Sequence, residues 1–341
     1  MAINKIYLEN FTVFSKLEMD FCNGINLLIG ENGTGKTHII KLLYAACQSA
    51  HSSTKVITFP QKIVQVFRPD DLKISRLLSR KAGNGTAKVQ VTSGKNTLKT
   101  TFSNKTQKWN ADIIGSQAWE KQLSHLISTF IPAKEILTHS KNLINAVDAG
   151  NVDFDDTYLD IITAASVKIT RGADTARAKK YLKELQRITN GTVAVEDEKF
   201  YLKPGNQAKL EFQLVAEGLR KIALLWQLIK NGTLEKGSIL FWDEPEANIN
   251  PRNIPAIVDL LLDLQEDGVQ IFIATHDYFL AKYLEIRCKK DSSMRFHSLY
   301  KQDEINSIGY EVSDKFTSLE NNLIIKEQFN IYQEEVKKVL D

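Results

Sequence analysis

The chain has 341 residues, of which 43% are hydrophobic and 25% charged, with a formal net charge of +3 at pH 7. This composition excludes a disordered chain, and the small positive charge permits contact with nucleic acid without arguing for it. The three scattered cysteines, the lack of a signal peptide and the lack of a long apolar segment favour a reduced, cytoplasmic protein with no membrane span in this chain.

The N-terminal part predicts strands around one helix. Residues 2–9 and 17–22 are expected to form strands, and the apolar run Ile25–Ile29 a short buried strand. A glycine-rich turn and an amphipathic helix follow. Residues 86–103 predict a polar, basic hairpin that turns at Ser93-Gly94.

The rest of the chain alternates between helices and strands. Strands are expected at 126–131, 192–196, 199–202, 238–242 and 269–274, and helices within 140–190 and at 217–230, 252–266 and 318–340. Such alternation predicts an α/β fold with a mainly parallel sheet covered on both faces. The more helical middle predicts a lobe of residues 105–215, inserted between nucleotide-binding halves 1–104 and 216–341.

A phosphate-binding loop follows the buried strand at 25–29. Its residues, which match G-x-x-x-x-G-K-[ST], are Gly30, Glu31, Asn32, Gly33, Thr34, Gly35, Lys36 and Thr37. Glycines let backbone N–H groups curl around phosphate oxygens, and the helix N-terminus adds a positive dipole end. We expect Lys36 to neutralise the β- and γ-phosphates of ATP and Thr37 to ligate Mg²⁺.

Two carboxylates end the apolar strand at 238–242. Asp243 is expected to hold Mg²⁺, and Glu244 to orient and deprotonate the attacking water. Adjacent carboxylates at the end of a buried strand are costly without a cation nearby, which favours a metal–nucleotide site. His276 follows the strand at 269–274, at the sheet edge where it is placed to contact a γ-phosphate.

Taken together, these motifs resemble the ABC-type ATPase superfamily, and within it the SMC/Rad50/RecF/OLD-like branch. The opening LENFTVFSKLEMDFCNGINLLIGENGTGKT resembles the start of that branch. The resemblance implies that Asp243-Glu244 is the Walker B pair, that Glu246–Asn250, including Asn248, is the D-loop, and that His276 is the switch histidine. It also implies a homodimer or higher homo-oligomer in which two heads sandwich two ATP molecules.

The signature motif of this branch resembles Val215–Lys221, so Ala216, Glu217 and Gly218 would face the nucleotide of the other subunit. Ala216 stands where the branch has a serine, and Thr12 stands where it has a basic residue that contacts the nucleotide. The segment Phe130–Glu135 resembles the Q-loop without its glutamine. Lys134 and Glu135 are candidates for sensing lobe closure, and the weaker candidates are Gln61, Gln65, Gln117 and Gln122.

The two nucleotide-binding halves are separated by about 200 residues without long heptads, which argues against a coiled-coil arm. No nuclease motif follows His276. The compact form resembles ATPase subunits of bacterial anti-phage systems, including retron-linked and Septu-like ones. We therefore expect an ATPase that dimerises around ATP and regulates a separate effector, such as a nuclease. The alternatives are a RecF-like ATPase that acts on DNA directly and a nucleotide-dependent scaffold with slow or no hydrolysis.

Three other features have competing interpretations. The basic hairpin around 86–108, with Phe102 and Trp109, is either a solvated face or a nucleic-acid contact. Residues 177–187 are a solvated helix face or a surface for a partner or DNA. The helix at 318–340 is expected to pack on the core or a lobe, with docking to another subunit as the alternative.

Overall fold

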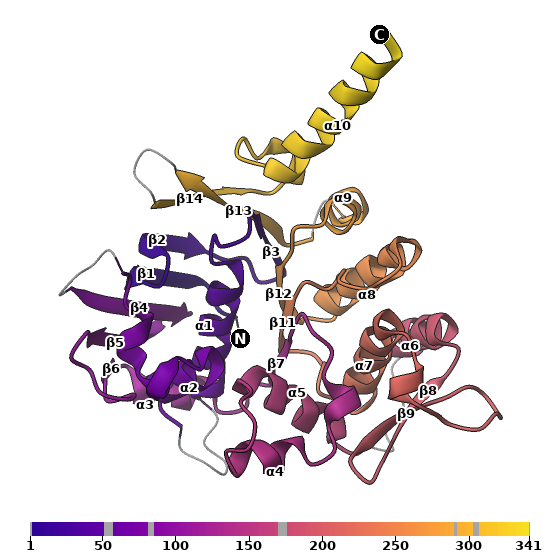
Figure 1. Ribbon diagram of the computed structural model, residues 1–341, viewed down its shortest axis with the longest axis horizontal. Helices are drawn as coiled ribbons and strands as arrows, with labels where there is room; N and C mark the ends of the chain where they lie inside the picture. The colour runs from indigo at the N-terminus through magenta and orange to yellow at the C-terminus, as the bar shows by residue number, and fades with distance from the viewer. Residues whose placement is uncertain are drawn as a thin grey trace.

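The computed structural model describes residues 2–50, 57–80, 85–169, 176–289, 292–302 and 307–340, which build an α/β fold (Figure 1). Within them, a six-stranded central sheet has the order β14-β13-β3-β12-β11-β7. Its strands are β3 (Ile25–Gly30), β7 (Ser128–Ile131), β11 (Ile239–Asp243), β12 (Gln270–Ala274), β13 (Met294–Gln302) and β14 (Ser307–Ser313). All neighbouring pairs are parallel except β13 and β14, so the prediction of a mainly parallel core sheet is confirmed.

The central sheet separates two hydrophobic cores. Strands β3, β11 and β12 are buried at every position, as expected for parallel strands covered on both faces. Successive side chains alternate between the faces: in β11, Leu240 and Trp242 join one core, and Ile239 and Phe241 join the other. Trp242 is therefore a core residue.

An antiparallel sheet and the helix after the phosphate loop cover one face. The helix is α1 (Lys36–Gln48), and the sheet has the order β2-β1-β4-β5-β6. Its strands are β1 (Lys5–Phe11), β2 (Phe14–Asp20), β4 (Thr86–Ser93), β5 (Asn96–Ser103) and β6 (Asp112–Ile114). The predicted hairpin is confirmed as β4 and β5, whose alternating burial reflects one face packed on the core.

Helices cover the other face (Figure 1). These helices are α4 (Leu143–Asp148), α5 (Asp156–Ser166), α6 (Ala176–Thr189), α7 (Glu217–Lys230), α8 (Ile254–Glu266) and α9 (Tyr278–Arg287). A small sheet accompanies them, formed by β8 (Thr192–Glu196), β9 (Lys199–Lys203) and β10 (Leu210–Glu211). Residues 170–175 of the predicted helical stretch lie outside the described residues.

The range 105–215 contributes to more than one layer. Strand β6 pairs with β5 in the antiparallel sheet, and β7 pairs with β11 in the central sheet. Helix α3 (Ser116–Leu123) lies between these strands along the chain and buries Trp119. The helices after β7 belong to the helical layer that covers the other face of the central sheet. The lobe boundaries at 105 and 215 remain a prediction.

Some elements were not anticipated from the sequence. Helix α2 (Phe59–Phe67) packs beside α1, and α9, β13 and β14 fill the stretch between His276 and the C-terminal helix. Strand β13 is the neighbour of β3, so it completes the sheet beside the phosphate loop. Such short elements give weak periodic signals, and their packing partners are distant in sequence.

The expectation that the C-terminal helix packs on the core is wrong for most of its length. Helix α10 (Leu323–Leu340) has no buried residue and extends away from the body of the molecule (Figure 1). Only Ile324 and Ile325, at its start, pack against the core. Its apolar side chains, including Phe329 and Tyr332, remain exposed. No helix among the described residues is long and apolar enough to cross a membrane.

Candidate functional site

The phosphate loop joins β3 to α1, and its backbone depends on glycine. Gly33 and Gly35 have φ values of +82° and +91°, in the left-handed region that favours glycine. A Cβ atom on Gly35 would lie 2.3 Å from the Phe14 ring, so the turn between β1 and β2 packs directly on the loop. A Cβ atom on Gly33 would meet nothing within 4 Å, so this side of the loop is open.

Lys36 turns back over its own loop. Its Nζ donates to the carbonyl oxygens of Gly30, at 2.7 Å, and Glu31, at 2.9 Å. The side chain is buried, and burial lowers its pKa, while the nearby carboxylates of Asp243 and Glu244 act in the opposite direction. The ammonium group therefore lies at the phosphate loop with two carbonyl contacts that a bound phosphate would compete for.

Thr37 and Asp243 come together across 206 residues of sequence. The Thr37 hydroxyl lies 3.0 Å from Oδ1 and 3.1 Å from Oδ2 of Asp243. Burial raises the pKa of Asp243 to about 6, and the Thr37 hydrogen bond opposes that rise. One hydroxyl and one carboxylate suit Mg²⁺, which binds through few protein ligands and keeps waters and phosphate oxygens as the others. The described residues contain no cluster of three or more acidic, His or Cys side chains that could hold a metal without a nucleotide.

Glu244 and His276 lie next to this pair, at the ends of β11 and β12. Oε1 of Glu244 is 3.6 Å from Nδ1 of His276, and both side chains are partly exposed. The Glu244 backbone has a φ of +46°, where a non-glycine residue is strained, and its N–H donates to the Ala274 carbonyl. This geometry turns a carboxylate from the buried strand toward solvent, where it can reach a water molecule.

The predicted signature segment and D-loop pack against each other. Helix α7 begins at Glu217, and a Cβ atom on Gly218 would lie 2.2 Å from the backbone oxygen of Asn248. Lys221, one turn along α7, donates to the Ala247 carbonyl at 3.0 Å. Ala216 is the exposed N-cap residue and provides no side-chain cap, so the first N–H groups of the helix remain available to a ligand.

The Q-loop candidates are separated by the structure. Strand β7 is parallel to β11, so Pro132–Glu135 leave the sheet at the edge that carries Asp243. Glu135, which is almost fully buried, pairs with Arg220 of α7 at 2.7 Å. Lys134 is exposed. Of the glutamines, Gln122 donates to Ser93 at the β4–β5 turn, and none of the four side chains bonds to the phosphate loop among the described residues.

A cluster of charges beside the loop was missed in the sequence. Lys41, one turn after Thr37 on α1, pairs with Asp155 at 2.7 Å, and Asp155 caps the N-terminus of α5. Lys62 of α2 pairs with Asp156 and Asp160 of α5, both at 2.7 Å. The first ion pair attaches α5 to the phosphate-loop helix α1, and the other two attach α5 to α2. The spacing of Lys41 from Thr37 places both on one face of α1 and was the available signal.

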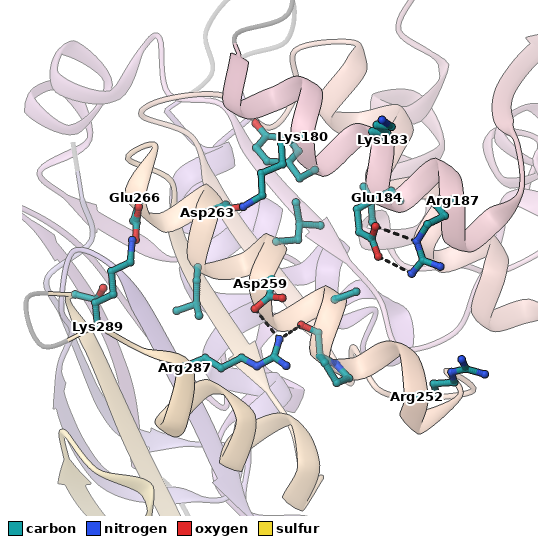
Figure 2. A pocket seen from close by; sticks show the side chains of 17 residues that line it. Lys180, Lys183, Glu184, Arg187, Arg252, Asp259, Asp263, Glu266, Arg287 and Lys289 are labelled. Atoms are coloured by element: carbon teal, nitrogen blue, oxygen red, sulfur yellow. Dashed lines mark hydrogen bonds and ion pairs between the residues drawn. The ribbon is translucent and has the colours of Figure 1, made fainter.

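The other predicted surfaces do not join the site. Phe102 is buried and cannot stack on a base, and Lys88 is paired with Glu9 at 2.9 Å. A cavity of about 870 Å³ lies between α6, α8 and the end of α9 (Figure 2). Most of its charges pair locally, as Arg187 does with Glu184 at 2.7 Å. The mixed charge of this cavity indicates no ligand class.

Comparisons with known proteins agree with this geometry. The profile of a family described as "AAA domain, putative AbiEii toxin, Type IV TA system" matches residues 25–282. The DNA replication and repair protein RecF of Streptococcus suis is 28% identical over 92 residues, which cover 27% of this chain and 24% of that protein. RecF of Francisella tularensis subsp. novicida is 29% identical over 108 residues, which cover 28% and 30%. The alignments thus span less than a third of these relatives.

Solved SMC heads share the fold. An SMC head bound to the C-terminal winged-helix domain of ScpA aligns with a TM-score of 0.59 and 12% identity, over 92% of this chain and 98% of that chain. An SMC head with an extended coiled coil, bound to the C-terminal domain of ScpA from Pyrococcus furiosus, aligns with a TM-score of 0.54 and 11% identity, over 98% and 99%. At these identities the likeness concerns the fold alone.

Proposed function

The chain belongs to this family of AAA domains, and from that premise we propose that it binds and hydrolyses ATP and uses the nucleotide to form a dimer that regulates a partner effector. The observation that carries the proposal is the convergence of Lys36, Thr37 and Asp243, with Glu244 and His276 alongside. Each of these groups has a role in phosphoryl transfer to water.

In the proposed reaction, ATP is the substrate and its β- and γ-phosphates lie on the N–H groups of the phosphate loop. Lys36 exchanges its carbonyl contacts for phosphate oxygens and stabilises their charge. Glu244 accepts a proton from the attacking water, and His276 contacts the γ-phosphate. Thr37 and Asp243 would hold Mg²⁺, which supplies further neutralisation of the phosphate charge when bound.

The dimer is supported by the exposed start of α7. The free N–H groups and the helix dipole at this end of α7 suit an anion. Gly218 of the same helix packs on the proposed D-loop of its own chain. We propose that Ala216, Glu217 and Gly218 face the γ-phosphate bound to a second copy. The D-loop residue Asn248 would then lie at the contact between the copies.

The effector is proposed from relatives. The family description names a toxin of a toxin–antitoxin system, which supports a setting in bacterial defence. The SMC heads bind ScpA, which supports a separate protein partner on the head. We propose a nuclease as the partner, because dimerisation around ATP would switch the activity of the nuclease on or off. RecF similarity favours a second candidate, in which the dimer acts on DNA directly.

The test is to compare Glu244→Gln with the wild type. Wild-type protein should hydrolyse Mg·ATP, and the variant should bind ATP but lose at least about a hundredfold in rate, because the general base is removed. Light scattering of Glu244→Gln should show an increase to a dimer mass, or to an assembly of dimers, when Mg·ATP is added.

Lys36→Ala is the matched control, which should lose ATP binding and remain unchanged in mass. ATP binding by Glu244→Gln without any change in mass would contradict the dimer and favour the scaffold alternative. DNA stimulation of hydrolysis that weakens steeply with salt would favour the RecF-like candidate.

A further inference from the structure

A second cavity lies directly beside the phosphate loop. Its volume is about 760 Å³, within the roughly 300–1,000 Å³ typical of small-molecule sites. One wall is Gly33 of the loop, and another is Thr12 and Val13 at the turn between β1 and β2. The segment 76–80 and the β13–β14 strands complete it. The cavity therefore begins on the side of the loop where Gly33 is open.

The lining of this cavity is cationic. Among the described residues that line it, the charged ones are Arg76, Arg80 and Lys301, and none is acidic. Lys301 pairs with Glu31 of the loop at 3.4 Å, while Arg76 has only a long, exposed contact with Asp70 at 3.8 Å. Arg80 has no ion pair with any described residue. A cavity with this charge favours an anionic ligand.

The two arginines stand on a fixed backbone. The N–H of Thr12 donates to the Leu77 carbonyl, and the N–H of Ser79 donates to the Asn10 carbonyl, both at 2.8 Å. These bonds hold the segment between Arg76 and Arg80 against the β1–β2 turn, which itself packs on Gly35. Arg76 and Arg80 therefore line the same cavity as Thr12, whose own side chain is uncharged.

We propose that this cavity receives the nucleoside end of ATP, and that Arg76 and Arg80 bind its α-phosphate. The β- and γ-phosphates occupy the loop, so the rest of the nucleotide must leave on an open side. The side at Gly33 opens into the cavity, and the first charged group to enter it is the α-phosphate. Guanidinium groups suit phosphate because their planar donors bind it bidentately. This inference rests on the ATP binding proposed above.

The experiment measures affinities of Arg76→Ala, Arg80→Ala and the double variant for ATP, inorganic triphosphate and pyrophosphate, by calorimetry. Pyrophosphate fills only the β- and γ-positions. We expect each substitution to weaken ATP and triphosphate about tenfold and to leave pyrophosphate unchanged. Arg76→Lys and Arg80→Lys should recover part of the loss. Arg187→Ala, an exposed arginine on α6, is the matched control.

Three results would overturn the inference. ATP affinity equal to that of the wild type in the double variant would remove the arginines from the site. Equal weakening of all three ligands would show a general effect of charge, and weakening of ATP alone would place the contact on the nucleoside. Failure of the wild type to bind ATP would instead contradict the proposed function. In that case neither Lys36→Ala nor the arginine variants would differ from the wild type.

Discussion

At the scale of single residues, the fold buries several ionisable groups whose charge is decided by their surroundings. Asp243 is held by Thr37 at the sheet edge, where burial raises its pKa. His297 of β13 is fully buried, and its two ring nitrogens lie within hydrogen-bond distance of Tyr310 and Asn26. Burial, with a smaller contribution from Arg295, lowers the pKa of His297 to about 3.

His297 gives the protein a pH-dependent stability. The folded state keeps this imidazole neutral, whereas the unfolded chain takes up a proton below about pH 6.5. The unfolded state then binds more protons, so the free energy of unfolding should fall as the pH drops from 6.5 toward 3. Between pH 7 and pH 5 the loss from this group should be about 2 kcal/mol.

Urea unfolding of wild type and His297→Gln at several pH values measures this effect. The variant should be less stable at pH 7, and its stability should fall less steeply toward pH 5. Parallel curves for the two proteins would contradict a neutral, buried His297.

At the scale of elements, ion pairs connect helices to the nucleotide-binding strands. Glu135 follows β7 and pairs with Arg220 of α7, so the end of a core strand is coupled to the helix that begins in the predicted signature segment. Arg220 also donates to the carbonyls of Phe212 and Val215, just before α7. One guanidinium therefore fixes both the approach to α7 and its orientation over the sheet.

Removal of one partner of this buried pair should be costly. Glu135→Ala should lower the free energy of unfolding by about 3 kcal/mol, because Arg220 then keeps its charge without a counter-ion. Arg220→Met in the same background should recover part of that loss. A double-mutant cycle by urea unfolding measures the coupling, and additive effects of the two changes would contradict it.

Helix α10 contributes little to stability in this structure. Its exposed apolar side chains Phe329, Tyr332, Val336 and Val339 recur at spacings of three and four, on one helical face. This face supports the docking alternative over core packing. A chain that ends at Lys326 keeps Ile324 and Ile325, which do contact the core.

Truncation after Lys326 should therefore change the melting temperature by no more than about 2 °C. Calorimetry of full-length and truncated protein, with Ile325→Ala as a control that should destabilise, tests this. A fall of more than about 5 °C would show that the helix packs on the body in solution.

At the scale of the whole molecule, this chain provides the phosphate side of the proposed nucleotide site. One chain brings Lys36, Asp243 and Glu244 together, whereas the start of α7 lies on the D-loop with free N–H groups. A second copy is the proposed source of the missing half. In that proposed contact, Ala216 supplies neither a cap nor a hydroxyl donor.

Ala216→Ser should strengthen the dimer. In a Glu244→Gln background, the new hydroxyl should cap α7, which stabilises the fold by about 1 kcal/mol, and lower the protein concentration needed for an ATP-dependent dimer. Sedimentation with Mg·ATP measures this change. Ala216→Thr and Ala216→Val form a matched pair of equal shape. Equal dimerisation by threonine and valine would contradict a role for the hydroxyl.

The sequence by itself determined four strands of the central sheet, β3, β7, β11 and β12, because each is a short apolar run bounded by turn residues. It also predicted the phosphate loop, the Asp243-Glu244 pair and His276, which end or directly follow three of these strands along the chain. Only the tertiary structure decided that Thr37 meets Asp243 across 206 residues, that Glu135 pairs with Arg220, and that α10 stays exposed. It also placed Arg76 and Arg80 in one cavity with Gly33 of the phosphate loop. Local patterns encode elements, whereas ion pairs and cavities depend on the parallel sheet that joins distant segments at one edge.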